Sequence, residues 1–145
     1  MRYLKWQSED GSHVIESMIG TITAEFVELS DSYLVPPSRI TSIEMISDLR
    51  HAQLHQISPR ECHRLGKVCA EQFSPRQQID LVIVVEKDDL ESHQKIGHYV
   101  APFKSCRNIS VSIKDTMEEA YDCLSIAQEV RESFNQQIKE VLELG

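Results

Sequence analysis

Apolar residues form their longest nearly unbroken run at 78–85, with the sequence Gln-Ile-Asp-Leu-Val-Ile-Val-Val. A run of β-branched residues without regular polar alternation is typical of a strand that is buried on both faces. We therefore expect a central strand at Ile79–Glu86. A second run, Ile-Ser-Val-Ser-Ile at 109–113, alternates strictly. It predicts a strand with one face less apolar than the other.

The first part of the chain has the pattern of a β-hairpin. Residues 2–8 alternate between apolar and polar, Asp10-Gly11 is a pair favoured in tight turns, and 13–19 supply the return strand. A helix is expected next, capped by Thr21 or Thr23 and ended by Pro36-Pro37. One longer helix beginning near Ile15 also fits the spacing, although Gly20 counts against it.

Three further helices have recognisable starts. Ser58-Pro59-Arg60-Glu61 combines a capping serine, a proline at the first helical position and a glutamate at capping-box spacing. Asp88 with Glu91 and Thr116 with Glu119 repeat that spacing before the next two helices. An isoleucine-rich strand at Ile40–Ser47 and a linker or short turn of helix at Asp48–Ile57 precede the first of these helices. Apolar residues then continue at helical spacing from Met117 to Val141, which predicts one long final helix.

The order of these elements is β-β-α-β-α-β-α-β-α, which places the chain in the α/β class. Strands that alternate with helices imply parallel pairing and right-handed crossovers. We expect one domain over residues 1–145, with a mixed sheet of about five strands, about four helices and a C-terminal helical extension from about residue 127.

Charge and hydropathy narrow the classes of partner. The formal net charge of the 145 residues is −8, which disfavours nonspecific binding to nucleic acid or to anionic membrane surfaces. No apolar stretch approaches the roughly 20 residues that cross a bilayer. The first residues lack the apolar region of a signal peptide. We expect a cytoplasmic protein without membrane insertion.

Four cysteines and a histidine pair are the candidates for metal or redox chemistry. Cys62 and Cys69 lie seven positions apart on a predicted helix, on a face shared with Leu65, Val68 and Phe73, and are expected to be buried thiols. His51 and His55 have the i,i+4 spacing of a metal-binding pair, but no glutamate lies between them. We expect surface histidines, no metal and no cofactor.

No catalytic residue is predicted. Asp88, Asp89 and Glu91 form an acidic group that a cation or an acid–base reaction would use, yet carboxylates are expected at a helix start in any case. The sequence contains no Ser-His-Asp order, glycine-rich phosphate loop or nucleotide-binding fingerprint. We expect a protein that is not an enzyme.

Several short strings resemble the STAS-like family, the fold of anti-sigma-factor antagonists, of sulfate-transporter tails and of many small bacterial proteins. The resemblance covers about His13 to Ile126. It rests on the following strings: Gly20-Thr21-Ile22-Thr23, Ile46-Ser47-Asp48-Leu49-Arg50, Ile57-Ser58-Pro59, Val82–Val85, Asn108-Ile109-Ser110-Val111 and Glu118-Glu119-Ala120.

This resemblance implies a non-enzymatic regulatory or scaffold module that binds another protein. In the antagonists, phosphorylation of a serine or threonine at the start of the second helix breaks that contact, and Ser58 stands at that place here. The antagonist motif has an aspartate before its serine, whereas Ile57 precedes Ser58 and Pro59 follows it. We expect Ser58 to act first as a helix cap, with a phospho-switch as the second hypothesis.

The final apolar stripe is a candidate interface. A long exposed stripe would be unusual on a monomer, so self-association as a two-fold homodimer is expected to cover it. The alternative is that this helix folds back and packs on the sheet of its own chain. The candidate interface residues are Val130, Phe134, Ile138, Val141 and Leu142.

Three functions remain open from the sequence. The first is the STAS-like module that acts through an unknown protein partner. The second is a carrier of a small apolar ligand or lipid, because related folds hold such molecules between sheet and helices. The third and weakest is a metal-dependent enzyme that uses His51 and His55.

Overall fold

The structure, a computed structural model, describes residues 1–34 and 39–144, and of residues 30–34 it describes the backbone alone. Pro36-Pro37, where the first helix was expected to end, lies outside these residues. The strands are β1 (Arg2–Gln7), β2 (His13–Thr21), β3 (Ser42–Asp48), β4 (Ala52–Gln53), β5 (Gln78–Val84) and β6 (Ile109–Lys114). The helices are α1 (Ala24–Leu34), α2 (Pro59–Gln72), α3 (Leu90–Val100), α4 (Met117–Cys123) and α5 (Gln128–Leu144), with a 3₁₀ turn, η1 (Ala101–Ser105).

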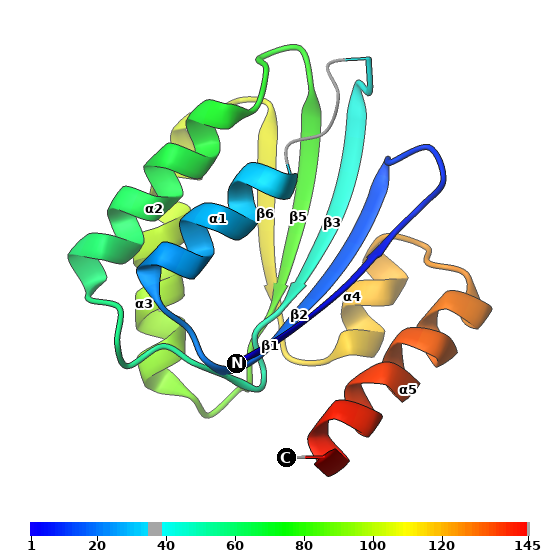
Figure 1. Ribbon diagram of the computed structural model, residues 1–145. Coiled ribbons are helices and arrows are strands. Elements are labelled where there is room, and N and C mark those ends of the chain that lie inside the picture. The colour runs from blue at the N-terminus through cyan, green and yellow to red at the C-terminus, as the bar shows by residue number, and fades with distance from the viewer. Residues whose placement is uncertain (35–38, 145) are drawn as a thin grey trace.

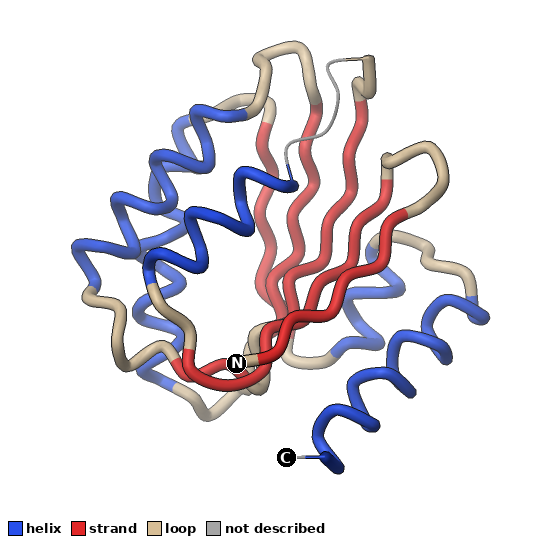
Figure 2. The backbone as a smooth tube through the Cα atoms, viewed as in Figure 1, coloured by secondary structure: helices blue, strands red, loops and turns tan. Residues whose placement is uncertain are grey.

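The strands form one mixed sheet in the order β1-β2-β3-β5-β6, and the short β4 pairs with the end of β2 (Figure 2). β1 and β2 are antiparallel, and every other pairing is parallel. The hairpin turn uses Gly11 at φ +79°, a backbone conformation that favours glycine. The predicted α/β class and the opening hairpin are thus confirmed.

Helices cover both faces of the sheet. α1, α2 and α3 lie on one side, and α4 and α5 lie on the other (Figure 1). β5 contributes to both cores, because Ile79, Leu81 and Ile83 face α1–α3 whereas Val82 and Val84 face α4–α5. The two-sided burial expected for this strand is confirmed, although β3 rather than β5 occupies the middle of the sheet.

The N-terminal segment also decides between two predictions. β2 continues to Thr21, so the alternative of one long helix from Ile15 is wrong. Gly20 has φ +104°, and its N–H donates to the carbonyl of His51 at 2.9 Å. The hydroxyl of Thr23 accepts the N–H of Phe26 at the start of α1. The segment expected as a linker or short turn of helix at Asp48–Ile57 contains β4. This short strand pairs with Gly20 and Thr21 at the end of β2.

The single long final helix predicted from Met117 onward is wrong. α4 ends at Cys123, and Ser125 takes a left-handed φ of 51°. The N–H of Ile126 donates back to the carbonyl of Tyr121 at 3.1 Å, which is a helix-ending contact. The break lets α5 turn back and pack its own apolar stripe on the same face of the sheet as α4 (Figure 1).

This turn corrects the candidate interface. Phe134 and Ile138 are only 1% and 4% exposed, because they pack in the core between α5 and the sheet of their own chain. Val130 and Val141 are half-buried, and Leu142 is exposed. The expectation that Phe134 and Ile138 face another protomer is therefore wrong, and the homodimer stays a prediction without its main support.

Two features of α2 and α3, on the opposite face of the sheet from α5, were not expected. Gly66 of α2 lies against α3 so closely that a Cβ at this position would stand 1.8 Å from the carbonyl oxygen of Tyr99. Val68, expected on the buried face of α2, is 37% exposed.

Within the described residues, no helix combines the length and apolar character needed to span a bilayer.

Candidate functional site

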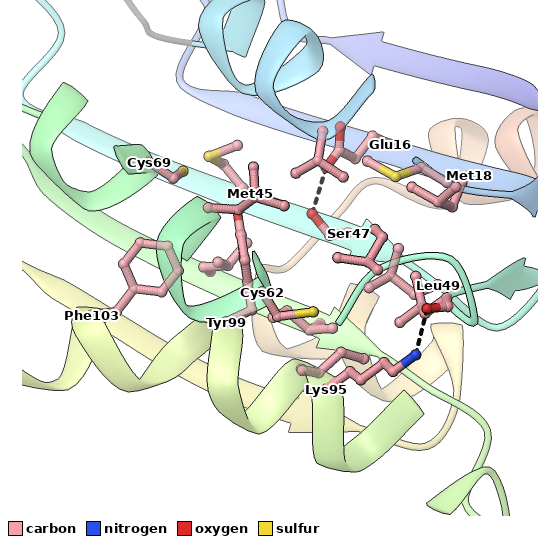
Figure 3. A pocket seen from close by; sticks show the side chains of 18 of the residues that line it. Glu16, Met18, Met45, Ser47, Leu49, Cys62, Cys69, Lys95, Tyr99 and Phe103 are labelled. Carbon is pink, nitrogen blue, oxygen red and sulfur yellow. Dashed lines mark hydrogen bonds between the residues drawn. The ribbon is translucent and has the colours of Figure 1, made fainter. Parts of the chain in front are cut away.

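A cavity of about 90 Å³ lies between the sheet and the layer of α1, α2 and α3 (Figure 3). Its floor is made by apolar side chains of four neighbouring strands, among them Met18, Met45, Ile83 and Ile109. Its roof includes Cys62 and Cys69 of α2. The surface of the cavity is almost wholly apolar, so it is suited to an apolar molecule or group.

Local sequence explains why this face is not filled. The residues that α2 points at the sheet include two small ones, Cys62 and Cys69, both buried as predicted. Gly66 holds α2 tightly against α3 rather than against the sheet. The opposite face is closed instead by large side chains, since Tyr121 and Phe134 are each at most 1% exposed. This cavity therefore lies on the α1–α3 side of the sheet.

Glu16 of β2 is the charged residue that lines this cavity from the sheet side. It is 3% exposed. Its Oε1 accepts a hydrogen bond from the hydroxyl of Ser47, and its Oε2 accepts one from the hydroxyl of Tyr3, both at 2.6 Å. Burial raises the pKa of the Glu16 carboxyl above its ordinary value, and the two hydroxyl donors oppose this only in part.

Lys95 of α3 lines the cavity from the helical side with its aliphatic stem. Its Nζ donates to the carbonyl of Leu54 at 2.7 Å and lies 3.1 Å from Oε1 of Glu91. The Glu91 side chain is 62% exposed, so this ammonium is held at the outer border of the site. Figure 3 shows Glu16 and Lys95 on opposite sides of the cavity.

Glu16 has no cation of its own among the described residues, where no Lys or Arg nitrogen forms an ion pair with it. Its cross-strand neighbour Lys5 is exposed and lowers the Glu16 pKa least of the groups that act on it. The cavity therefore combines an apolar wall with one buried, hydrogen-bonded carboxyl that no cation neutralises.

The other face of the sheet carries a buried carboxyl with a full set of partners. This carboxyl belongs to Asp48, which is 0% exposed. It accepts hydrogen bonds from Nε and Nη2 of Arg50 at 2.8 and 3.1 Å and from the hydroxyl of Ser17 at 2.9 Å. Beside it runs an open groove between α4 and α5 that His51 also lines. Two basic side chains, Arg50 and Lys139, and two acidic ones, Glu118 and Glu143, line this groove.

Apart from Cys62 and Cys69, the residues singled out by sequence do not line the cavity. Ser58 is exposed and caps α2: its hydroxyl accepts the N–H of Glu61 at 3.1 Å, and Glu61 accepts the N–H of Ser58 at 3.2 Å. The capping box predicted there is present. Asp89, rather than Asp88, caps α3 through the N–H of Ser92.

The histidine pair is not arranged as a helical metal site. His51 and His55 lie in the loop around β4, so their i,i+4 spacing does not place them on one helix face. His51 is half-buried and His55 is exposed. In the parts of the chain that the structure describes, no group of three or more His, Cys, Asp or Glu side chains is placed to hold a metal ion.

Sequence reasoning missed the three buried charged residues. Glu16 stands in a mostly apolar strand, His-Val-Ile-Glu-Ser-Met-Ile at 13–19, and Asp48, the last residue of β3, comes directly after the predicted strand Ile40–Ser47. A charge inside an apolar strand was the signal that could have found Glu16. Lys95 adjoins the apolar stripe of α3 and carries no such signal, because its burial depends on the packing of α2 against α3.

No protein-family model matches this chain, and a search of curated proteins finds no relative.

Proposed function

We propose that this chain is a non-enzymatic binding module whose cavity between the sheet and α1–α3 holds a small apolar ligand. The observation that carries the proposal is the cavity itself, almost entirely apolar and placed between well-packed elements. Burial of apolar ligand surface there would stabilise a complex by roughly 25 cal/mol per Å². Protein interiors are close-packed, so an apolar space inside the core needs an explanation.

The size of the cavity bounds the ligand. An apolar cavity of about 150 Å³ accommodates benzene. The space of about 90 Å³ in this chain accordingly fits an apolar group of about four non-hydrogen atoms. Met18 and Met45, whose unbranched side chains adapt to different shapes, line the space and allow modest enlargement. A compact alkyl group suits this site, and a long acyl chain does not fit without rearrangement.

A STAS-like module that binds a protein partner is the second candidate. Ser58 at the start of α2 is exposed, and Leu90 at the start of α3 is 78% exposed. A phosphate on Ser58 would add negative charge beside Arg60, which is the change that the antagonist-type switch requires. One exposed leucine and one serine make a weaker argument than a formed cavity, so ligand binding stands first.

Methionine methyl groups offer a direct test, because the chain has four methionines in distinct places. Met18 and Met45 line the cavity, Met117 packs on the opposite face, and Met1 is exposed. We expect NMR titration with small apolar compounds such as cyclopropane to shift the methyl signals of Met18 and Met45 and to leave the other two in place.

Two cysteine variants supply the matched control. Cys69→Leu adds volume inside the cavity, whereas Cys123→Leu makes the same chemical change at an exposed position. Cys69→Leu should abolish the methyl shifts, and Cys123→Leu should keep them. Absence of a selective shift at Met18 and Met45 in the unaltered chain would contradict the proposal.

A further inference from the structure

Glu16 lines the cavity, but a purely apolar ligand would form no hydrogen bond with its carboxyl group. A carboxylate offers about four lone-pair positions for hydrogen bonds. The hydroxyls of Ser47 and Tyr3 occupy one position on each oxygen. Each oxygen thus retains acceptor capacity, and the residue lines the cavity. A ligand group in the cavity that donates a hydrogen bond therefore has an acceptor there.

Asp48 shows what a buried carboxylate receives elsewhere in this fold. It has the fork of Arg50 in a two-point contact together with one hydroxyl from Ser17. Glu16 has two hydroxyls and no comparable cation among the described residues. A buried charge without a counter-charge is costly, and a buried carboxyl avoids that cost by keeping its proton.

We infer that the cavity binds a small apolar amine, and that Glu16 receives its ammonium group. This inference rests on the proposed ligand-binding function and adds the polar half of the ligand. The alkyl part would occupy the space beside Met18 and Met45. The ammonium would donate hydrogen bonds to the free positions of the Glu16 oxygens, and such charge-assisted bonds are roughly twice as strong as neutral ones.

The charged groups around the cavity agree with a cation at Glu16. Lys95, on the other side, already donates to the Leu54 carbonyl and pairs with Glu91, so it does not neutralise Glu16. Lys5 is exposed at the sheet edge, and Cys62 and Cys69 are the thiols that line the cavity from α2. The net charge of −8 also favours the approach of a cation over that of an anion.

Alternative headgroups match this arrangement less well. A ligand carboxylate would place a second negative charge beside a buried acid, which is unfavourable for both groups. An alcohol would donate one hydrogen bond but bring no positive charge that favours the ionised form of Glu16. Binding of an ammonium instead lets Glu16 ionise: its carboxyl proton passes to solvent, and the ammonium keeps all its protons. A pH-dependent release of protons is therefore a signature of the amine complex.

Three ligands of equal length test the inference, namely butan-1-amine, butan-1-ol and butanoate. Titration calorimetry on the full chain should give a dissociation constant for the amine about tenfold lower than that for the alcohol, as expected for a charge-assisted hydrogen bond, and the weakest binding for butanoate. Below the pH at which Glu16 ionises, amine binding should release protons, seen as a dependence of the enthalpy on the buffer.

Glu16→Gln should remove the preference for the amine while butan-1-ol still binds. Glu129→Gln removes the same charge from an exposed position on α5 and should keep the preference. Equal binding of amine and alcohol by the unaltered chain, or an amine preference that survives Glu16→Gln, would overturn the inference. Alcohol binding without an amine preference overturns the inference alone, whereas failure of all apolar probes overturns the proposed function with it.

Discussion

Glu16 and Asp48 are buried acids on neighbouring strands of the same sheet, but they face opposite sides of it. Asp48 meets Arg50 and Ser17 on the α4–α5 face, in a core closed by Tyr121 and Phe134. Glu16 accepts hydrogen bonds from two hydroxyl groups on the α1–α3 face, and it lines a cavity. The two faces share the same strands. They differ because Asp48 forms an ion pair with Arg50, whereas Glu16 is hydrogen-bonded to neutral hydroxyl groups.

The comparison separates a structural role from a binding role. A bidentate arginine and a filled core hold the end of β3 in one geometry. A carboxyl without a cation beside unfilled apolar space is what the proposed ligand would complete in charge and volume. We therefore propose a structural role for the Asp48–Arg50 pair and a binding role for Glu16.

The largest expected effect comes from breaking the ion pair on the α4–α5 face. Arg50→Met leaves Asp48 buried without its cation and should lower the free energy of unfolding by about 3–5 kcal/mol. Arg64→Met breaks the exposed pair with Glu28 and should cost under about 1 kcal/mol. Urea denaturation of both variants measures the difference. Equal losses would mean that the Asp48–Arg50 pair has no special structural role.

The roof of the cavity depends on the close contact of α2 with α3. Gly66→Ala places a Cβ against the backbone of Tyr99 and should destabilise the chain by about 1–3 kcal/mol or more. Gly97→Ala is the matched control, because no atom lies within 4 Å of the added Cβ, and it should stabilise α3 by about 0.5–1 kcal/mol. Thermal denaturation should show melting temperatures that move in opposite directions, and a Gly66→Ala variant as stable as the parent would contradict the packing described.

Glu16 should make stability depend on pH. Its pKa is raised in the folded chain, so the folded state keeps a proton that the unfolded chain loses above its ordinary glutamate pKa of about 4.3. Stability should fall as pH rises from that value toward the pKa of folded Glu16, by at most about 1.4 kcal/mol per pH unit. Glu16→Gln should remove this decline, and Glu129→Gln should keep it. A parent and a Glu16→Gln variant with parallel pH profiles would show that Glu16 ionises normally.

The smallest effect is expected at the start of α2, where the cap is exposed. Ser58→Ala removes the acceptor for the N–H of Glu61 and should lower the free energy of unfolding by about 1 kcal/mol. Ser58→Asp retains a capping oxygen and should cost less. Chemical denaturation tests both variants. If Ser58→Ala leaves stability unchanged but alters binding of a partner protein, the STAS-like switch gains support over the cap.

Local patterns predicted most of the fold. The β-branched run at 78–85 indicated a strand buried on both faces, and Ser58 with Glu61 marked the start of α2. These signals succeed because they act over a few residues. The break at Ser125 was missed because the apolar spacing continues through it, and only packing on the sheet shows that α5 turns back.

The candidate site was less predictable than the fold. Its cavity depends on small side chains of α2 standing opposite strands distant in sequence, a relation that no local pattern contains. Its carboxyl was visible as one glutamate in an apolar strand, but the partners Tyr3 and Ser47 come from two other strands. Whether a buried acid has a cation is decided by tertiary contacts.

We propose that the buried acid Glu16 binds a cationic ligand. A pH titration of the Glu16 carboxyl carbon by NMR tests this proposal. We predict a midpoint above the ordinary glutamate value of about 4.3 for the free chain, and a lower midpoint when butan-1-amine is present. A midpoint at or below the ordinary value that the amine does not move would contradict the account.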